Sequence, residues 1–236
     1  MIADTRTNAG LDDISTFRKL HVFDWPGERN FVLCTAGNLS VSQSVVSLLH
    51  EGLPAAAAGG EPETLATVPT LFRAAQLVGR AIRQVRETDG PALREAGVKF
   101  DVSMLFGGQI GGQTPRLFMM YGAGNFIECG PDAPFLQIGE HKYGKPILDR
   151  AINVRTELYD ALKIGLISMD STMRSNLGVG LPIDIAVLRR GESRFELNRR
   201  IEAGEPYFQD LRERWSAALR AAHTAIPRPP YGPVED

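Results

Sequence analysis

The chain has 236 residues, and its formal net charge of −2 and pI near 6.1 give it no general attraction to nucleic acid or to an anionic membrane surface. Hydrophobic residues make up 43% of the sequence and charged residues 23%, a composition with enough apolar residues for a sizeable globular core. No apolar run approaches the roughly 20 residues of a membrane span, and the first residues lack the apolar segment of a secretory signal.

One domain is expected over residues 1–226, because no linker-like stretch divides the chain. Residues 227–236 are expected to form a Pro-rich tail that is mobile or drapes over a partner. Cys34 and Cys129 belong to no metal-binding or redox motif and are interpreted as reduced core residues. A cytoplasmic location is the resulting expectation.

The first 37 residues indicate strands. Residues 1–5 form a short apolar stretch that turns polar, and residues 7–10 contain turn formers. Residues 17–24 alternate with the period of a strand. Residues 31–35 are uninterruptedly apolar, which favours a strand that is buried on both faces.

Two helices are predicted next, and we expect them to form one layer against a sheet. Apolar residues between 41 and 49 share one helical face, with Ser40 and Ser42 available as N-terminal caps. Apolar residues between 71 and 85 recur every three or four positions and predict a second, longer helix.

The rest of the chain alternates between strand-rich and helical blocks. Strands are predicted over residues 100–106, 116–121, 125–129, 135–139, 183–190 and 194–200. Helices are predicted over residues 142–151, 155–175 and 207–223. This order differs from strict βαβα alternation and favours an α+β fold, a four-layer αββα sandwich of two mainly antiparallel sheets between two helical layers.

Residues 139–146 follow the spacing G-x-x-x-x-G-K of a phosphate-binding loop. That loop ends with a Ser or Thr that binds Mg²⁺, whereas Pro146 has neither a hydroxyl nor an amide hydrogen. A plain strand-to-helix turn is the better interpretation. The Gly-rich stretch 107–112 is interpreted as a hairpin tip, since it lacks dinucleotide-binding spacing. The four histidines are isolated from one another, so neither a metal nor a cofactor is expected.

Three N-terminal stretches carry the main functional pattern: DTRTNAG at residues 4–10, FRKLHV at 17–22 and TAGN at 35–38. They are similar to the proteasome β-subunit pattern of an Asp and an Arg on one strand, a Lys entering the next, and Ala-Gly before a helix. With ISTFRK at 14–19, QIGE at 137–140 and MDSTMRSN at 169–176, they resemble the bacterial Anbu (ancestral β-subunit) family. The likeness runs from Met1 to the last helix.

The resemblance implies a proteasome-type threonine peptidase with the N-terminal-nucleophile hydrolase fold. In such enzymes an N-terminal Thr attacks the substrate, and its own α-amine, with a pKa of about 8, is the general base. By the resemblance, Lys19 adds positive charge beside the attacking hydroxyl, Asp4 orients Lys19, and Arg6 braces the strand. The backbone N–H of Gly37 would donate into the oxyanion hole, and Thr35 would line the specificity pocket.

The resemblance is weaker for the groups that support the terminal amine. Ser175, together with Asp170, would correspond to a supporting Ser and Asp, but the usual Asp-x-x-Ser-Gly wording is missing. Gly139-Glu140 stands where many proteasome subunits have a serine. Structural alternatives stay open, because the Asp4–Lys19 pair could be an ordinary ion pair and Gly37 a simple turn glycine.

The expected catalytic Thr is absent from the chain as written. Only three residues precede Asp4, whereas a further strand and turn would need roughly a dozen more. Either the start has been assigned to an internal Met, or the chain is truncated and inactive. The first explanation is preferred here, since Lys19, Asp4 and Gly37 occur together.

Three functions follow from this pattern. The first is a threonine endopeptidase that cleaves peptides or unfolded proteins, and the second is a non-catalytic subunit that uses the same sandwich for assembly. A small-amide hydrolase of the same fold is the third. Self-association into a ring or spiral is expected in either of the first two cases, with no nucleic-acid or membrane partner.

Overall fold

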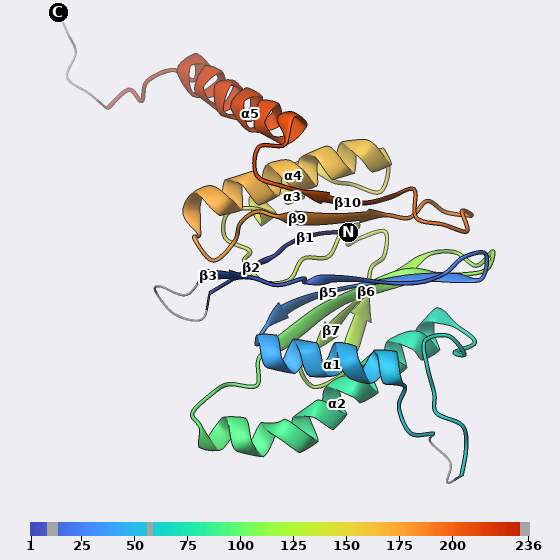
Figure 1. Ribbon diagram of the computed structural model, residues 1–236. Helices are drawn as coiled ribbons and strands as arrows, with labels where there is room; N and C mark the ends of the chain where they lie inside the picture. Colours follow the sequence, from blue (N-terminus) through green and yellow to red (C-terminus); the bar gives the residue numbers. More distant parts are fainter. Residues whose placement is uncertain (9–13, 56–58, 232–236) are drawn as a thin grey trace, which may run out of the picture.

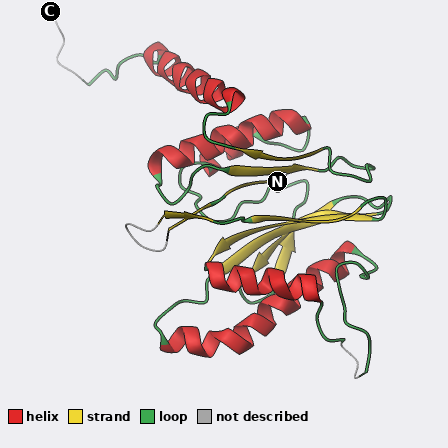
Figure 2. Ribbon diagram, viewed as in Figure 1, coloured by secondary structure: helices red, strands yellow, loops and turns green. Residues whose placement is uncertain are grey.

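Four layers of secondary structure stack in the computed structural model, which describes residues 1–8, 14–55 and 59–231 (Figure 1). Two helices cover the outer face of a five-stranded sheet, a second sheet lies against its inner face, and further helices cover that second sheet (Figure 2). This arrangement confirms the predicted α+β sandwich. The helices are α1 (Leu39–Glu51), α2 (Leu71–Glu95), α3 (Lys145–Ala151), α4 (Leu158–Ser175) and α5 (Pro206–Ala225).

The larger sheet is antiparallel and runs in the order β4-β5-β6-β7-β8. Its strands are β4 (Leu20–Trp25), β5 (Arg29–Gly37), β6 (Val102–Ile110), β7 (Arg116–Tyr121) and β8 (Phe126–Glu128). The centre of β5 is buried on both faces, as its uninterrupted apolar run predicts. Phe31 and Leu33 face the core shared with α1 and α2, whereas Val32 and Cys34 face the second sheet.

The second sheet has the order β1-β9-β10 and is also antiparallel. Its strands are β1 (Ile2–Asp4), β9 (Ile183–Val187) and β10 (Leu197–Ile201). A separate pair joins β2 (Arg6–Asn8) to β3 (Ile14–Thr16). Because Asp4 ends β1 and Arg6 begins β2, the chain passes from one sheet to the small pair at the point that carries the charged residues.

Local signals account for most helix boundaries, with one correction. Ser40 and Ser42 were expected to cap α1, but the Asn38 side chain accepts hydrogen bonds from the backbone N–H groups of Ser40 and Val41. Asn is as good an N-cap as Ser, and it stands one position before the first helical residue. Helix α2 continues to Glu95, ten residues beyond Val85, the last apolar residue of the predicted stripe; these residues are mostly polar, although Leu93 still packs against the core.

Three predicted stretches differ from the structure. Residues 135–139 form no strand but an irregular segment, so the phosphate-loop-like stretch does not follow a strand. Residues 7–8, predicted within a turn, belong to β2, and the rest of that turn lies outside the described residues. Gly107 and Gly108 continue β6, since they pair with residues 32 and 31 of β5, whereas Gly111 and Gly112 form the predicted hairpin turn between β6 and β7. Short apolar or Gly-rich runs do not distinguish strand from loop without their partners.

Candidate active site

A cleft of about 780 Å³ lies between the two sheets. Its volume is within the usual range for pockets that enclose small ligands or peptide side chains, and its lining is mostly apolar. Asp4, Arg6 and Lys19 contribute charged groups to the lining, and Thr35, Ala36 and Gly37 contribute the end of β5. The cleft therefore brings together the three N-terminal stretches of the sequence pattern.

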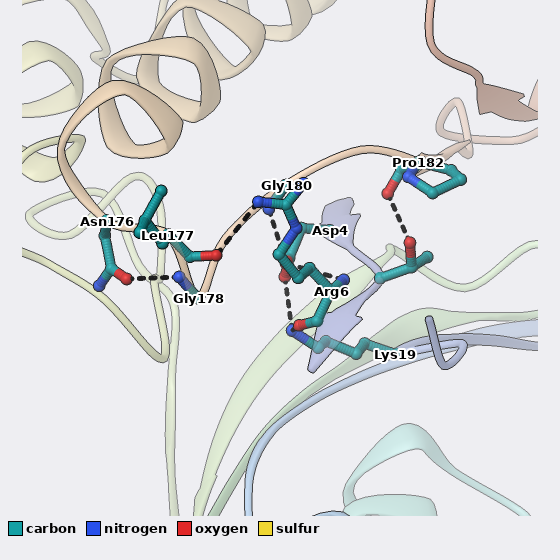
Figure 3. A network of polar contacts seen from close by, with 9 residues as sticks. Asp4, Arg6, Lys19, Asn176, Leu177, Gly178, Gly180 and Pro182 are labelled. Carbon is teal, nitrogen blue, oxygen red and sulfur yellow. Dashed lines mark hydrogen bonds and ion pairs between the residues drawn. The ribbon is translucent and has the colours of Figure 1, made fainter. Parts of the chain in front are cut away.

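Lys19 and Asp4 form an ion pair in this cleft, with Lys19 Nζ 2.8 Å from Asp4 Oδ1 (Figure 3). Both side chains are largely shielded from solvent, with relative exposures of 20% for Lys19 and 11% for Asp4. The Lys19 ammonium also donates to the carbonyl oxygen of Arg6. Asp4 Oδ2 accepts from the backbone N–H groups of Arg6 (3.1 Å) and Gly180 (3.2 Å). These contacts hold the lysine ammonium in one position at the cleft.

The loop after α4, residues 176–182, is named the strap here, because it is hydrogen-bonded to the segment that joins β1 and β2 (Figure 3). The Arg6 guanidinium donates to the carbonyl of Leu177 (3.2 Å), and the buried Thr5 hydroxyl donates to the carbonyl of Pro182 (2.8 Å). With the Gly180 contact to Asp4, the strap contacts three consecutive residues of the pattern. The Arg6 side chain therefore fixes the strap to the start of β2.

Glu140 reaches the same strap from the other side of the cleft. Its carboxylate accepts from the Asn176 side-chain amide (2.8 Å) and from the Lys142 backbone N–H (2.8 Å). The hydrogen bond from the Lys142 N–H makes the larger contribution, and together the two hydrogen bonds lower the pKa of Glu140 below its usual value. The side-chain carbonyl oxygen of Asn176 in turn accepts a hydrogen bond from the backbone N–H of Gly178 (2.8 Å). In the sequence, Glu140 belongs to the QIGE motif and stands beside a departure from a serine, but nothing local connects it to Asn176, which lies 36 positions away.

Gly37 stands where only glycine fits. Its φ of +102° is unfavourable for residues with a side chain, and a Cβ there would collide with the carbonyl of Asp101. The adjacent backbone is tied on both sides, since the Thr35 N–H donates to the Lys19 carbonyl (2.9 Å) and the Asn38 N–H donates to the Asp101 carbonyl (2.7 Å). These hydrogen bonds hold the end of β5 in place beside Lys19, where it lines the cleft.

Two other predicted residues lie elsewhere. Ser175 is the exposed last residue of α4 and does not line the cleft. Asp170 is fully buried and pairs with Arg174 (3.2 Å) and with Arg212 of α5 (2.5 Å), so its carboxylate joins two helices. The structure therefore gives neither residue a contact with the Asp4–Lys19 pair, and their predicted support of a terminal amine stays a prediction.

Two side chains near the pair, Thr5 and Cys34, carry groups that could in principle act as nucleophiles. The Thr5 hydroxyl is buried and already donates to Pro182. Burial raises the pKa of the Cys34 thiol to about 12, so it is not a thiolate near neutral pH. Among the described residues, no three His, Cys, Asp or Glu side chains gather to hold a metal ion. In the same part of the chain, no helix has the length and apolarity to cross a membrane.

Comparison with solved structures shows close relatives along nearly the whole chain. Anbu (ancestral β-subunit) from Yersinia bercovieri is 44% identical, with a TM-score of 0.88 over 98% of this chain and 94% of that chain. The helical assembly of the Anbu complex from Pseudomonas aeruginosa gives 44% identity and a TM-score of 0.87 over 98% and 93%. A Gly-1 mutant of Anbu from Hyphomicrobium sp. strain MC1 gives 48% identity and 0.86 over 96% and 92%. No protein-family model and no curated protein sequence matches the chain.

Proposed function

The chain belongs to the Anbu (ancestral β-subunit) family, and we propose that it forms the body of a proteasome-like threonine peptidase subunit that self-assembles. One observation carries the catalytic part: the Lys19–Asp4 pair, at 2.8 Å, lines a cleft beside the glycine that ends β5. An ordinary surface ion pair would contribute little and would not need three further hydrogen bonds.

The proposed nucleophile is the hydroxyl of an N-terminal Thr on an additional strand that precedes the residues present here. The cleft supports this, because the Thr7 hydroxyl and the Gln137 side-chain carbonyl both line it and are buried without a partner among the described residues. Buried polar atoms are normally hydrogen-bonded, and an inserted strand offers the backbone groups that would pair with them.

In the proposed reaction, the α-amine of that Thr takes the proton of its hydroxyl as the oxygen attacks the peptide carbonyl. The Lys19 ammonium favours the developing negative charge, and the Gly37 N–H donates to the oxyanion. As the intermediate collapses, the α-ammonium gives its proton to the leaving nitrogen, so the new amine is released and an ester remains on the Thr. Water then attacks this ester and releases the acid.

Covalent labelling tests the proposal. The protein is extended by the segment encoded directly upstream of the Met1 codon and treated with an electrophilic peptide probe. We expect the probe on an N-terminal Thr, and we expect Lys19→Ala to abolish labelling while the fold and assembly persist. Lys163→Ala is the matched control, because Lys163 makes an exposed ion pair with Asp160 on α4. An in-frame stop codon directly upstream, or an unlabelled extended protein, would refute the proposed peptidase.

A non-catalytic assembly subunit is the second candidate. The bonded Thr5 hydroxyl and the protonated Cys34 favour it, since the described residues alone provide no activated nucleophile beside Lys19. If the extended protein assembles but neither binds the probe nor cleaves short fluorogenic peptides, this second function is the correct one.

A further inference from the structure

A second cavity, of about 640 Å³, lies in the outer helical layer, away from the cleft between the two sheets. It is named the α2 pocket here and is lined by α2 between residues 73 and 83, by the segment 63–69 before that helix, and by residues 124 and 126 beside the start of β8. Figure 1 shows α2 on the far side of the larger sheet from β1. The volume is within the usual range for pockets that enclose a small ligand.

The side of α2 that lines this pocket is strongly basic. Residues 71–86 contain four arginines and no acidic residue, and Arg73, Arg80 and Arg83 line the pocket. Among the described residues of the lining only Glu63 is acidic, so three positive charges face one negative charge. Arg73 also stands in the first turn of α2, where the helix dipole adds positive potential. Like charges on successive turns of a helix repel one another, so the free helix face favours an added negative charge.

Two of these arginines have clear structural partners. Arg80 pairs with the Glu63 carboxylate (2.8 Å) and donates to the Pro54 carbonyl oxygen (2.6 Å). Arg83 donates to the Gly124 carbonyl oxygen (3.0 Å). These contacts hold both guanidinium groups at the edges of the pocket, but only one of their partners is charged.

Arg73 makes no contact of this kind with another element. Its guanidinium donates to the side-chain oxygen of Gln76, a neutral group one turn along the same helix (2.8 Å). Within the described part of the chain no carboxylate forms an ion pair with it, and its side chain is exposed. A guanidinium has five N–H donors in a planar fork that matches the oxygens of a carboxylate or a phosphate. Most of the Arg73 donors are therefore available to a ligand in the pocket.

The rest of the lining includes preformed apolar surface. Val68 and Leu77 belong to the buried core beneath the pocket. The Phe126 ring packs edge-on against the rings of Phe72 and Phe118, at centroid separations of 5.7 Å and 5.4 Å. A ring that is held in place costs little conformational entropy when a ligand packs against it. A ligand that fits this lining has an apolar body next to its anionic group.

We propose that the α2 pocket binds a small organic anion, with a phosphate or carboxylate group on an apolar body. The Arg73 guanidinium donates to two oxygens of the anionic group, and the positive charges of Arg80 and Arg83 strengthen the attraction. Leu77 and Phe126 contact the apolar body. Because the pocket lies outside the cleft, this binding site does not depend on the proposed peptidase reaction.

Isothermal titration calorimetry of the full chain at low salt tests the proposal with phenyl phosphate, benzoate and the neutral benzyl alcohol. We expect at least one of the two anions to bind, with the tighter one identifying the anionic group, and benzyl alcohol to bind at least about 10-fold more weakly. Arg73→Gln should weaken binding of that anion about 10-fold or more, because it removes a charge-assisted contact. Arg73→Lys should give an intermediate affinity, since it keeps the charge and loses the planar fork.

Arg94→Gln is the matched control. It makes the same change of charge at an exposed position of the same helix, outside the pocket. Its affinity for the anion should equal that of the unchanged chain. Circular dichroism should show that all three variants melt within a few degrees of the unchanged chain, because neither arginine side chain joins α2 to another element.

The other results would overturn the proposal. It is wrong if neither anion binds, if benzyl alcohol binds as tightly as the anions, or if Arg73→Gln and Arg94→Gln weaken binding equally. Inorganic phosphate that binds as tightly as phenyl phosphate would show that the apolar wall takes no part. A glutamate-rich peptide that binds through Arg73, when neither small anion does, would assign the pocket to a protein partner. None of these results depends on labelling of a threonine or on assembly.

Discussion

At the scale of single residues, Asp4 does more than pair with Lys19. Its carboxylate also receives the N–H groups of Arg6 and Gly180, so it connects the lysine, the turn between β1 and β2, and the strap. The exposed Asp160 and Lys163 side chains on α4 form a simple ion pair at 2.6 Å, and neither is buried. The two pairs share their chemistry and differ in burial and in hydrogen bonding.

This difference predicts unequal effects of the same substitution. Asp4→Asn should lower the free energy of unfolding by about 3 kcal/mol, the lower end for breaking a buried pair, because the Lys19 side chain keeps some solvent contact. Asp160→Asn should change it by less than about 1 kcal/mol. Urea denaturation of both variants measures the difference. Equal losses would show that the Asp4 pair is an ordinary surface pair.

Cys34 gives a residue-scale prediction about pH. Burial raises its pKa to about 12, whereas the thiol of the unfolded chain ionises near pH 8.5. Above pH 8.5 the unfolded state therefore binds fewer protons than the folded state, and the contribution of Cys34 to stability falls as pH rises towards 12. At pH 8 a thiol reagent should modify Cys34 only in urea, and the partly exposed Cys129 should react first. Rapid modification of native Cys34 would contradict its burial.

At the scale of elements, close backbone contact positions α2 on the larger sheet. Gly79 of α2 packs directly against the backbone of Gly124, which lies in the turn between β7 and β8. A Cβ on either glycine would collide with the carbonyl oxygen of the other. Arg83 closes the contact by donating to the Gly124 carbonyl at 3.0 Å. A glycine in mid-helix is otherwise unfavourable, so this packing offsets the cost.

Gly79→Ala should therefore destabilise the protein, although alanine favours helices by about 1 kcal/mol over glycine. The expected loss is about 1–3 kcal/mol, as for overpacked cores, because the obstacle is backbone that cannot rotate away. Thr88→Ala, at an exposed position of the same helix, is the control and should be within about 0.5 kcal/mol of the unchanged chain. Thermal unfolding compares them, and a higher melting temperature for Gly79→Ala would refute the close contact.

The strap is the element that assembles the site from distant segments. It follows α4, contacts β1 and β2 through Asp4 and Arg6, and reaches Glu140 through Asn176. Since the pKa of Glu140 is lowered, the contribution of these hydrogen bonds to stability is present above its unfolded value of about 4.3 and is lost as pH falls through the folded value.

At the scale of the whole molecule, the two sides of the sandwich are unequal. The core between α1, α2 and the larger sheet contains most of the large buried side chains, whereas the core between the smaller sheet and α4 has fewer. A third, small cluster joins the two sheets beside the cleft. Stability should therefore be uneven across the sandwich.

Hydrogen exchange should reveal this inequality. Amides of α2, β5 and β6 should exchange slowest, and those of β9, β10 and the first half of α5 should exchange faster, because fewer buried contacts hold them. The part of α5 from residue 217 onward should exchange fastest, because all of its residues are exposed. Mass spectrometry of peptic fragments measures the order, and slower exchange in β10 than in β5 would contradict it.

Local patterns along the chain were sufficient for the kinds and order of most elements. Helical periodicity, strand alternation and turn residues act over a few neighbours, so they predicted α2, α4 and β7 and the four layers that they build. The roles expected for Asp4, Lys19 and Gly37 rest on motif resemblance, which local periodicity does not contain. Residues 135–139 were mistaken for a strand because an apolar run does not reveal whether a pairing partner exists.

Only the folded chain decided which distant groups meet. The Glu140–Asn176 contact spans 36 positions, the Arg212–Asp170 pair 42 and the Gly180–Asp4 hydrogen bond 176, and no local pattern encodes such separations. Tertiary packing likewise buries apolar side chains in the first half of α5 and leaves those in the second half exposed, although their helical spacing is the same in both halves. Periodicity specifies which face of a helix is apolar, whereas the surface that covers that face depends on where the rest of the chain, or another chain, is placed.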